Sequence, residues 1–341
     1  DVLTGEQLSA RAGVVVNVGG PWVDAVLGAS RGPRLIGGTK GSHVVVAAFP
    51  GAPTDALYVE ARRDGRPYFV VPWNGQYLIG TTDSRYEGDL DWVVADDEEI
   101  EYLLAETNRV LPTADLGRDD VLSSYAGVRP LPYREGGAAG AITRRHVVRD
   151  HGKHGGPRGL LSIVGGKLTT YRELAEQATD DVFRLLERAS PPPRTADEPL
   201  PGARGATPAL PGVPARSADH LRRVYGTRAG EVLEAAGDDP VLREPFDTSS
   251  GAIGAEVRWA VEREGARTLA DILLRRTMVG LGPEVGVGAD IAAAEIARRA
   301  LGWDGARAAA EVAAYRKSIS RYRPRSLELA PADALPETAT P

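Results

Sequence analysis

Two basic side chains in this sequence are of a type and setting that suit capture of an anionic small molecule. Lys167 follows the glycine pair 165–166, and Arg129 lies in the apolar segment 125–131, YAGVRPL. A guanidinium can hold a carboxylate or a phosphate through two parallel hydrogen bonds, whereas an arginine in an apolar segment is poorly explained as a solvated charge. A structural ion pair with one of the acidic residues is the alternative for Arg129. Lys167 has its own alternative, a solvated charge beside a tight turn.

Two further side chains are weaker candidates for the same chemistry. Arg144 lies in the predicted strand 141–148 and offers a second cation, although a cation on a surface strand is the simpler interpretation. His43 precedes a valine-rich strand and could act as a general base, because an unperturbed imidazole titrates near neutral pH. A lone histidine is more often structural. Without other information, both residues are therefore second-rank candidates.

Three other histidines lie close together in the sequence: His146, His151 and His154. Their spacing is irregular, the segment is rich in glycine, and no cluster of carboxylates completes a ligand set. No metal site is predicted.

The segment 160–172, LLSIVGGKLTTYR, contains the element that must position Lys167. It reads as a buried strand, a glycine turn and the start of a helix, with Thr170 and Glu173 in the positions of a capping box. Apolar residues recur at three-and-four spacing as far as Leu186, which predicts a helix packed on one side. Such a turn directs unpaired N–H groups and the positive end of the helix dipole at one spot, where an electron-rich or anionic group is expected.

Two kinds of nucleotide-binding loop are excluded by these residues. A P-loop would need glycine at position 161 and Ser or Thr at 168, and both positions are leucine. A second strand-glycine-helix unit spans 14–27, but Pro21 and Trp22 follow its glycines, so it is not the G-x-G-x-x-G of a dinucleotide site. The glycines of 280–286 have the wrong spacing as well.

The composition places the chain among ordinary soluble globular proteins, with 42% hydrophobic and 26% charged residues in 341. The net charge of −6 argues against a general nucleic-acid binder. Cysteine is absent, which excludes disulfides, a thiolate nucleophile and a Cys-ligated metal, and is compatible with a reducing cytoplasm. No stretch approaches the roughly 18 apolar residues of a membrane span, so any membrane association is expected to be peripheral.

The pattern of turns and apolar residues predicts four regions along the chain. Residues 1–190 combine the two strand-glycine-helix units with an antiparallel sheet, whose hairpin turns are marked by Asp64-Gly65 and Asn74-Gly75. Residues 191–216 are a proline-rich linker, residues 217–320 form a small all-α domain, and residues 321–341 are a polar tail expected to be disordered.

Five motifs stand in the order found in one enzyme family, and together they are far more specific than any single glycine pattern. The chain resembles the FAD-dependent sn-glycerol-3-phosphate dehydrogenases of the aerobic type over nearly its whole length. Segments 256–262, EVRWAVE, and 273–277, LLRRT, resemble the C-terminal domain of that family. The five motifs are NVGGPWVD at 17–24, KGSH at 40–43, IGTTD at 79–83, YAGVRP at 125–130 and GGKLTTYR at 165–172.

The resemblance implies an α/β or α+β fold. We expect a glutathione-reductase-like FAD domain with an antiparallel substrate-domain sheet, followed by the small all-α domain. Members of the family begin with a βαβ unit that carries G-x-G-x-x-G and holds the ADP half of FAD, and these residues start after it. The sequence therefore predicts a remnant of the FAD domain that retains FAD weakly or not at all and is inactive alone.

The resemblance also assigns roles to residues. It implies that Arg129 and Arg144 hold the substrate phosphate, that His43 also binds substrate, and that His43, Arg129 and Lys167 are catalytic. The base that takes the proton of the substrate is not assigned. Residues implied to contact the FAD cofactor are Gly20, Pro21, Trp22, Gly165, Gly166, Lys167, Leu168, Thr169 and Thr170.

The implied reaction is the oxidation of sn-glycerol 3-phosphate to dihydroxyacetone phosphate in glycerol metabolism, with electrons passed to a quinone. A cytoplasmic protein docked peripherally on the inner face of the cell membrane would fit this role. No nucleic-acid partner is expected, and a homodimer is left open. The alternatives are a glycerol-3-phosphate oxidase, an amine or amino-acid oxidase relative of the same fold, and a non-catalytic truncated remnant that binds partners through its helical domain.

Overall fold

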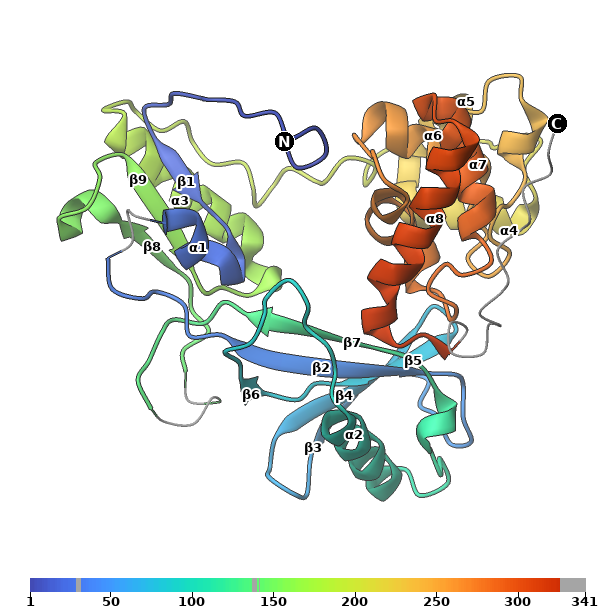
Figure 1. Cartoon of the computed structure of the whole chain (residues 1–341), viewed down its shortest axis with the longest axis horizontal. Helices are drawn as coiled ribbons and strands as arrows, with labels where there is room; N and C mark the ends of the chain where they lie inside the picture. Colours follow the sequence, from blue (N-terminus) through green and yellow to red (C-terminus); the bar gives the residue numbers. More distant parts are fainter. Residues whose placement is uncertain (29–31, 137–139, 141, 326–341) are drawn as a thin grey trace. The chain divides into compact units, whose positions relative to one another are not determined.

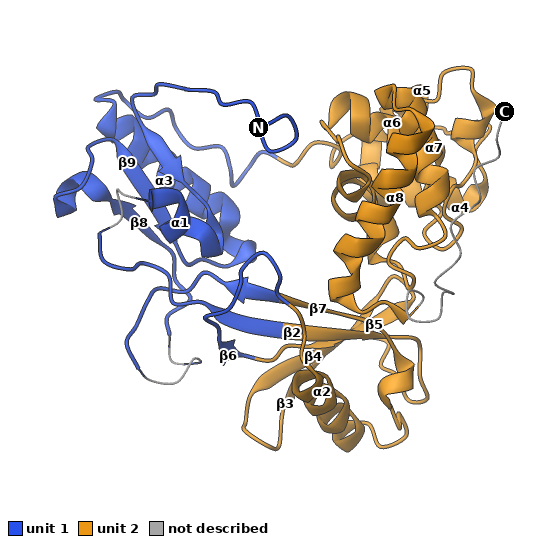
Figure 2. Ribbon diagram, viewed as in Figure 1, with its two compact units in different colours: residues 1–41, 83–93, 127–198 blue, residues 42–82, 94–126, 199–341 orange. Residues whose placement is uncertain are grey.

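The computed structural model describes residues 1–28, 32–136, 140 and 142–325, and it divides into two compact units that are each assembled from separate stretches of the chain (Figures 1 and 2). Unit 1 contains residues 1–41, 83–93 and 127–198. Unit 2 contains residues 42–82, 94–126 and 199–341. The two units are described separately below.

Unit 1 is built on a three-stranded sheet. Its order is β1 (Val15–Asn17), β9 (Leu160–Val164) and β8 (Val147–Asp150); β9 runs parallel to β1 and antiparallel to β8. Helix α1 (Val23–Leu27) contributes to a small apolar core on this sheet, and helix α3 (Tyr171–Leu185) follows β9 in the chain. The buried members of that core are Val23, Leu27, Ile36 and Val164.

The start of α3 differs from the prediction. Residues Leu168–Thr170 form a 3-10 turn, so Thr170 lies inside the helical winding rather than at an extended position before it. Its hydroxyl donates to the carbonyl of Lys167 at 3.2 Å and makes no cap bond. The predicted capping box with Glu173 is therefore wrong. The predicted apolar face of α3 also contains no buried residue among those described.

The strand predicted at 141–148 is shifted. Pairing with β9 begins only at Val147, and residues 142–146 are irregular. Arg144 therefore lies in a loop rather than in a strand, and Ala141 is outside the described residues. From this loop the guanidinium of Arg144 contacts the carboxylate of Asp83, a residue of another segment.

The sheet that continues through unit 2 is antiparallel, as predicted. Its path is β3 (Leu57–Glu60), β4 (Pro67–Trp73), β5 (Gln76–Gly80), β2 (Thr39–Val46) and β6 (Ser84–Arg85), and β7 (Val121–Arg129) also pairs with β2. The first residues of β2, the last of β7 and all of β6 belong to unit 1. At the β4–β5 turn, Asn74 and Gly75 have φ of 49° and 77°, as the Asx-Gly signal predicted.

Helix α2 (Asp97–Val110) supplies the second layer of this sheet's core. Ile100, Leu103 and Leu104 are buried at three-and-four spacing and pack with residues of β2, β4 and β5. Asp96 caps the helix, since its side chain accepts from the backbone N–H of Glu99 at 2.9 Å and Glu99 reaches back to the N–H of Asp96. The β2 strand begins five residues before the predicted start at 44, which places Lys40 and Ser42 in buried strand positions.

The rest of unit 2 is the all-α part, and the prediction of a helical C-terminal region is confirmed. Its core gathers Val257, Leu273, Tyr315 and their neighbours. The predicted helix 268–279 is instead a π-helical segment, η9 (Asp271–Arg276), followed by a turn. The α-helices are α4 (Ala215–Tyr225), α5 (Ala229–Glu234), α6 (Gly254–Arg263), α7 (Asp290–Leu301) and α8 (Gly305–Ile319). Short 3-10 turns are η1 (Gly20–Trp22), η3 (Arg118–Asp120), η5 (His151–His154), η6 (Leu168–Thr170), η7 (Gly226–Arg228), η8 (Pro240–Arg243), η10 (Val279–Leu281) and η11 (Ser320–Tyr322).

Within the described ranges, none of the helices is both long enough and apolar enough to span a bilayer. The tail predicted to be disordered, 321–341, lies outside the described residues from 326 onwards. At its beginning, Arg323 makes an ion pair with Asp97 of α2 at 2.5 Å.

His151 gives unit 1 a pH-dependent stability. The ring is buried and its Nε2 lies 2.8 Å from Oγ of Ser162 on β9. Burial, followed by the charges of Arg149 and His154, lowers the pKa of His151 below its ordinary value of 6.5. The unfolded chain therefore binds this proton more readily than the folded one, so stability is lost as the pH falls through 6.5 towards the folded pKa.

We expect the urea concentration at the midpoint of unfolding to decrease when the pH is lowered from about 7.5 to about 5.5. In His151→Gln this decrease should be smaller, since an amide does not titrate in this range. Equal pH slopes in the two proteins would show that His151 is not responsible.

Candidate active site

Two glycine turns meet at one edge of the unit 1 sheet. Strands β1 and β9 are parallel, with Asn17 opposite Ser162. The carboxyl ends of parallel strands lie at the same edge, so the turn that follows each strand starts from that edge. The structure therefore brings together the predicted cofactor segments 20–22 and 165–170, although about 145 residues separate them in the sequence.

The first turn is held by a buried asparagine. Asn17 donates from Nδ2 to the carbonyl of Val23 at 3.0 Å, and its Oδ1 accepts from the N–H of Gly19 at 3.0 Å. Gly20 has a φ of 56°, in the left-handed region that favours glycine. The indole N–H of Trp22 donates to Asp91 at 3.0 Å. The sequence analysis did not assign Asn17 a role. An amide side chain directly after a run of valines could have indicated a residue that holds the following turn.

The second turn is fastened to the segment that carries Arg129. The N–H of Gly165 donates to the carbonyl of Pro130, the next residue after Arg129, at 2.9 Å. Gly165 and Gly166 have φ of 76° and 105°, and a Cβ on Gly165 would lie 2.8 Å from the carbonyl oxygen of Arg145. Backbone segments that carry Arg129, Arg144 and Lys167 therefore converge at this turn.

Replacing Gly165 with alanine tests how closely this turn is packed. We expect Gly165→Ala to lower the free energy of unfolding by about 2 to 4 kcal/mol, because the left-handed φ is strained for alanine and the methyl group would overlap a carbonyl oxygen. Gly65→Ala is the matched control: its φ is 70°, but nothing lies within 4 Å of the added carbon. Its expected loss is about 1 to 2 kcal/mol. Equal losses in urea denaturation would mean that the turn can relax away from Arg145.

Lys167 follows these glycines and is exposed, and the two residues after it are exposed as well. Its ammonium makes no ion pair or hydrogen bond with any residue that the structure describes. Lys167 is therefore available to a bound group at the edge where the two turns meet.

Arg129 and Arg144 share one carboxylate. Nη1 of Arg129 lies 3.1 Å from Oδ1 of Asp83, and Nη2 of Arg144 lies 3.4 Å from Oδ2. The side chain of Asp83 is 11% exposed, that of Arg129 is 23% exposed and that of Arg144 is 47% exposed. The ion pair considered as the alternative for Arg129 therefore exists. Within these two ion pairs among the described residues, two guanidinium groups share a single carboxylate, so a phosphate can still add favourable charge–charge contacts to them.

Asp83 and Glu99 are residues that sequence reasoning missed. Asp83 directly follows the threonine pair after β5, and only its position in a recurring motif singles it out. Glu99 is buried in unit 2, where its carboxylate accepts from the hydroxyls of Ser42 and Thr82, each at 2.7 Å. Ser42 precedes His43 in the chain, and Thr82 precedes Asp83. Glu99 therefore holds both segments in place. The sequence signal that could have identified it is the D-x-x-E pattern of a capping box, Asp96 to Glu99, at the start of α2.

His43 lies in the unit 2 part of β2, whereas Arg129, Arg144 and Lys167 lie in unit 1. Its ring stacks on that of Tyr125, with centroids 4.8 Å apart and planes inclined by 10°. The His43 ring packs against Gly80, and a Cβ added to Gly80 would lie 2.3 Å from Cδ2 of the ring. Burial raises the pKa of Tyr125 above its ordinary value of 10.0, so the phenol that supports His43 is neutral at neutral pH.

Two of the three clustered histidines, His146 and His151, have other partners. His146 Nε2 lies 2.7 Å from Oε1 of Gln177, and His151 contacts Ser162 as described above. Among the described residues, no group of three His, Cys, Asp or Glu side chains is arranged to hold a metal.

Residues 1–172 match the family model described as FAD dependent oxidoreductase, which is half of the chain. A glycerol-3-phosphate dehydrogenase from Synechocystis sp. is 49% identical over 300 residues, covering 82% of this chain and 54% of that protein. The chain belongs to the FAD-dependent glycerol-3-phosphate dehydrogenase family. The five sequence motifs had predicted this membership, and it is confirmed. Residues 162–308 also match a model described as the C-terminal domain of alpha-glycerophosphate oxidase.

Two other dehydrogenases are similar to this chain over a comparable extent. An aerobic glycerol-3-phosphate dehydrogenase of Escherichia coli is 36% identical over 299 residues, and a D-erythritol 1-phosphate dehydrogenase of Brucella abortus is 38% identical over 289. They cover 82% and 80% of this chain, and 58% and 56% of their own lengths are matched. The chain thus spans about half the length of the curated relatives that it matches.

A solved structure supports the fold. The glycerol-3-phosphate dehydrogenase from Bacillus halodurans, determined with FAD, matches 91% of this chain and 62% of its own with a TM-score of 0.70 at 26% identity. The predicted fold class, an FAD-dependent oxidoreductase fold with an antiparallel sheet and a helical C-terminal part, is confirmed.

Proposed function

We propose that this chain serves the FAD-dependent oxidation of sn-glycerol 3-phosphate to dihydroxyacetone phosphate. The observation that carries the proposal is the meeting of two features in unit 1: an arginine pair ordered by Asp83, and a lysine-bearing glycine turn hydrogen-bonded to the segment of Arg129. The names of the Synechocystis and E. coli relatives support the same substrate.

The substrate phosphate is assigned to Arg129 and Arg144. A phosphate monoester carries close to two negative charges at neutral pH and offers three acceptor oxygens, which suit two guanidinium groups. Asp83 holds both guanidiniums before substrate arrives, so less side-chain entropy is lost on binding. The phosphate is expected to compete with Asp83 for part of their hydrogen-bonding capacity.

The residues present fit the flavin of FAD at the edge where the two glycine turns meet. The turns 20–22 and 165–170 would hold it, because positive-φ glycines let the backbone approach a flat ring closely and Lys167 adds a positive charge. When bound, FAD supplies a two-electron acceptor. The Bacillus halodurans dehydrogenase, whose structure was solved as a complex with FAD, supports this cofactor.

The C2 hydroxyl must lose a proton as its carbon is oxidised. His43 and Lys167 are the proposed groups for that proton, with His43 held by its stacking on Tyr125 and the close passage over Gly80. The choice between them requires a pH–rate profile of each variant.

The acceptor of the electrons is proposed to be a quinone at a membrane surface, where a cytoplasmic protein would dock peripherally. The second candidate is transfer to oxygen, which the description of the matched C-terminal model, an oxidase, favours. An amine or amino-acid oxidase fits less well, because its substrates carry no phosphate for the arginine pair.

The test compares the chain alone with the same chain completed by the remaining portion of the Synechocystis relative. We expect the completed protein to bind flavin and to reduce an artificial dye when glycerol 3-phosphate is added. Hydrogen peroxide released in place of dye reduction would indicate an oxidase. Faster turnover of D-erythritol 1-phosphate than of glycerol 3-phosphate would identify the former as the preferred substrate. Flavin binding with no turnover of any polyol phosphate would favour a non-catalytic binding role and contradict the proposal.

A further inference from the structure

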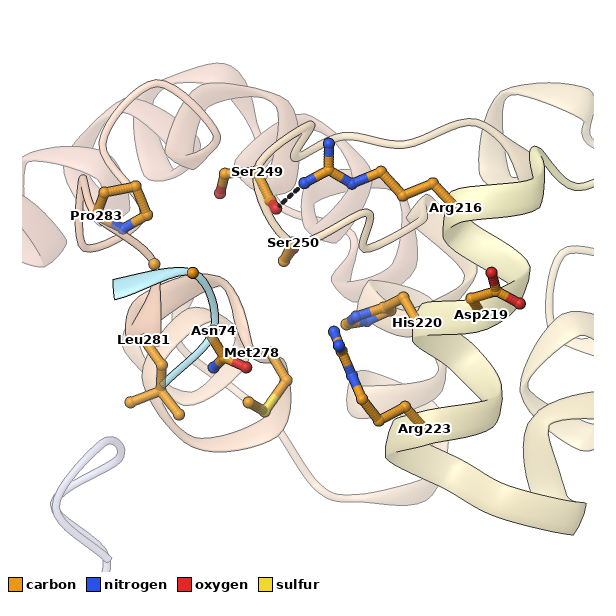
Figure 3. A pocket seen from close by; sticks show the side chains of 12 residues that line it. Asn74, Arg216, Asp219, His220, Arg223, Ser249, Ser250, Met278, Leu281 and Pro283 are labelled. Carbon is orange, nitrogen blue, oxygen red and sulfur yellow. Dashed lines mark hydrogen bonds between the residues drawn. The ribbon is translucent and has the colours of Figure 1, made fainter. Parts of the chain in front are cut away.

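A pocket of about 590 Å³ lies in unit 2, and its lining includes none of the residues assigned to the proposed reaction. Its walls come from helix α4, the turn at Ser249-Ser250, the β4–β5 hairpin turn and segment 278–283 (Figure 3). That volume is within the range of small-molecule sites, about 300 to 1,000 Å³.

One face of α4 presents three nitrogen-bearing side chains to this pocket. Arg216, His220 and Arg223 follow the i, i+4, i+7 spacing of a helix face, and Figure 3 shows them extending to the same side. Arg216 donates to the carbonyl of Ser249 across the pocket mouth. Arg223 makes no ion pair or hydrogen bond with any described residue. Asp219, the acidic residue on the lining, is paired at 3.2 Å with Arg222.

His220 is the decisive residue. It is 1% exposed, and its Nδ1 has no hydrogen-bond partner among the described residues. A buried polar atom without a partner costs about 1 to 3 kcal/mol, so a ligand that supplied a partner for Nδ1 would recover that cost. Nδ1 can donate to an anion when the ring is protonated and accept from a hydroxyl when it is neutral.

Glu256 fixes the ring in this orientation. Its buried carboxylate lies 3.0 Å from Nε2 of His220 and also accepts from the hydroxyl of Tyr225 at 3.1 Å and the N–H of Ile253 at 2.8 Å. Because Nε2 is committed to Glu256, Nδ1 is the ring nitrogen left for a ligand.

We propose that this pocket binds a small phosphate ester that carries free hydroxyls. Arg216 and Arg223 supply the positive charge for the phosphate, with His220 beneath them. The hydroxyls of Ser249 and Ser250 already donate to Asp247, and Oγ of Ser250 also accepts from the N–H of Ala252 at 3.1 Å. Oγ of Ser249 is therefore the stronger acceptor for a hydroxyl of the ligand, and Oγ of Ser250 keeps one lone pair. The side chains of Met278, Leu281 and Pro283 supply apolar atoms of the lining, which would cover the carbon chain of the ligand.

The pocket shares no residue with the proposed phosphate-binding pair or the glycine turns. Its lining lies wholly in unit 2, whereas Arg129, Arg144 and Lys167 lie in unit 1. A ligand here would bind in addition to the molecule being oxidised.

The test uses two non-reacting probes, inorganic phosphate and glycerol 2-phosphate, titrated at constant ionic strength by calorimetry. Arg223→Gln is expected to weaken binding in the pocket about tenfold or more, through loss of a charge-assisted contact. Arg222→Gln is the control for net charge, since it removes the same charge from the neighbouring position of α4 and Arg222 is not on the lining. It also unpairs the carboxylate of Asp219, but that side chain is 80% exposed, so water screens its charge. Its expected change is less than about twofold.

A second readout places the ligand. Both probes are expected to shift the ¹⁵N signal of His220 Nδ1 and the amide signals of Ser249 and Ser250, including in an Arg129→Gln background that weakens the other site. Equal weakening by the Arg222 and Arg223 variants, or unchanged signals at His220 on saturation, would overturn the proposal. Because Arg223 is exposed and has no described partner, Arg223→Gln is expected to keep the melting temperature of the parent, which the same samples verify.

Discussion

Replacing Arg129 with lysine is expected to lower kcat/KM for glycerol 3-phosphate by about 30-fold to about 4,000-fold in the completed protein, or about 2 to 5 kcal/mol. Lysine keeps the charge but presents a single ammonium, so it cannot bond Asp83 and a phosphate oxygen in the fork geometry of a guanidinium. The side chain is only 23% exposed, which limits how far water can replace the lost bond.

The measurement is steady-state dye reduction over a range of glycerol 3-phosphate concentrations, together with urea denaturation of the same samples. Arg145→Lys is the matched control, because Arg145 is exposed, lies next to Arg144 and makes no side-chain contact with Asp83. It should keep kcat/KM within about twofold. An unchanged kcat/KM in Arg129→Lys, or a loss of stability large enough to account for the lost activity, would remove Arg129 from the substrate site.

Replacing Glu256 with alanine should lower the free energy of unfolding of the helical part by about 3 to 5 kcal/mol. The variant removes one buried carboxylate and leaves three donors without an acceptor: the ring of His220, the hydroxyl of Tyr225 and the N–H of Ile253. The bond from the N–H of Ile253 is also the one that caps the start of α6, so its loss leaves an N-terminal N–H of that helix without an acceptor. Burial is the largest cause that raises the pKa of Tyr225 above its ordinary value, and it persists in the variant, so that phenol cannot adapt by ionising.

Glu262→Ala, in the last turns of the same helix, is the control. Glu262 pairs with Arg258 at 2.6 Å, and both side chains are 42% exposed, so its loss should cost less than about 1 kcal/mol. Urea denaturation followed by far-UV circular dichroism gives both values. A Glu256→Ala loss as small as that of Glu262→Ala would mean that water enters and satisfies the three donors.

The sequence by itself determined the features that depend on near neighbours in the chain. Asn74-Gly75 predicted a hairpin turn because few other pairs tolerate positive φ at both positions. The apolar spacing of α2 and of the helical part predicted amphipathic helices, since a helix buries one face whatever it packs against. Five short motifs in order were specific enough to identify the family before any contact was known.

Local reasoning failed where two local conformations compete. Thr170 and Glu173 have the residue types of a capping box, yet a 3-10 turn at 168–170 draws Thr170 into the helix. Arg144 was predicted in a strand because its neighbours suit one, but pairing with β9 begins only at Val147. In both cases the glycine turn at 165–166 and its backbone bond to Pro130 constrain the nearby chain, and composition does not report such constraints.

Only the tertiary structure decided which side chains share a partner. Asp83 lies 46 residues from Arg129, and Ser42 lies 57 residues from Glu99, so no spacing rule connects them. The parallel register of Asn17 with Ser162 brings the two glycine turns to one edge, and the placement of α4 beside α6 brings His220 to Glu256. Periodicity records which face of an element is buried, whereas the identity of a buried partner is set by how strands pair and helices pack.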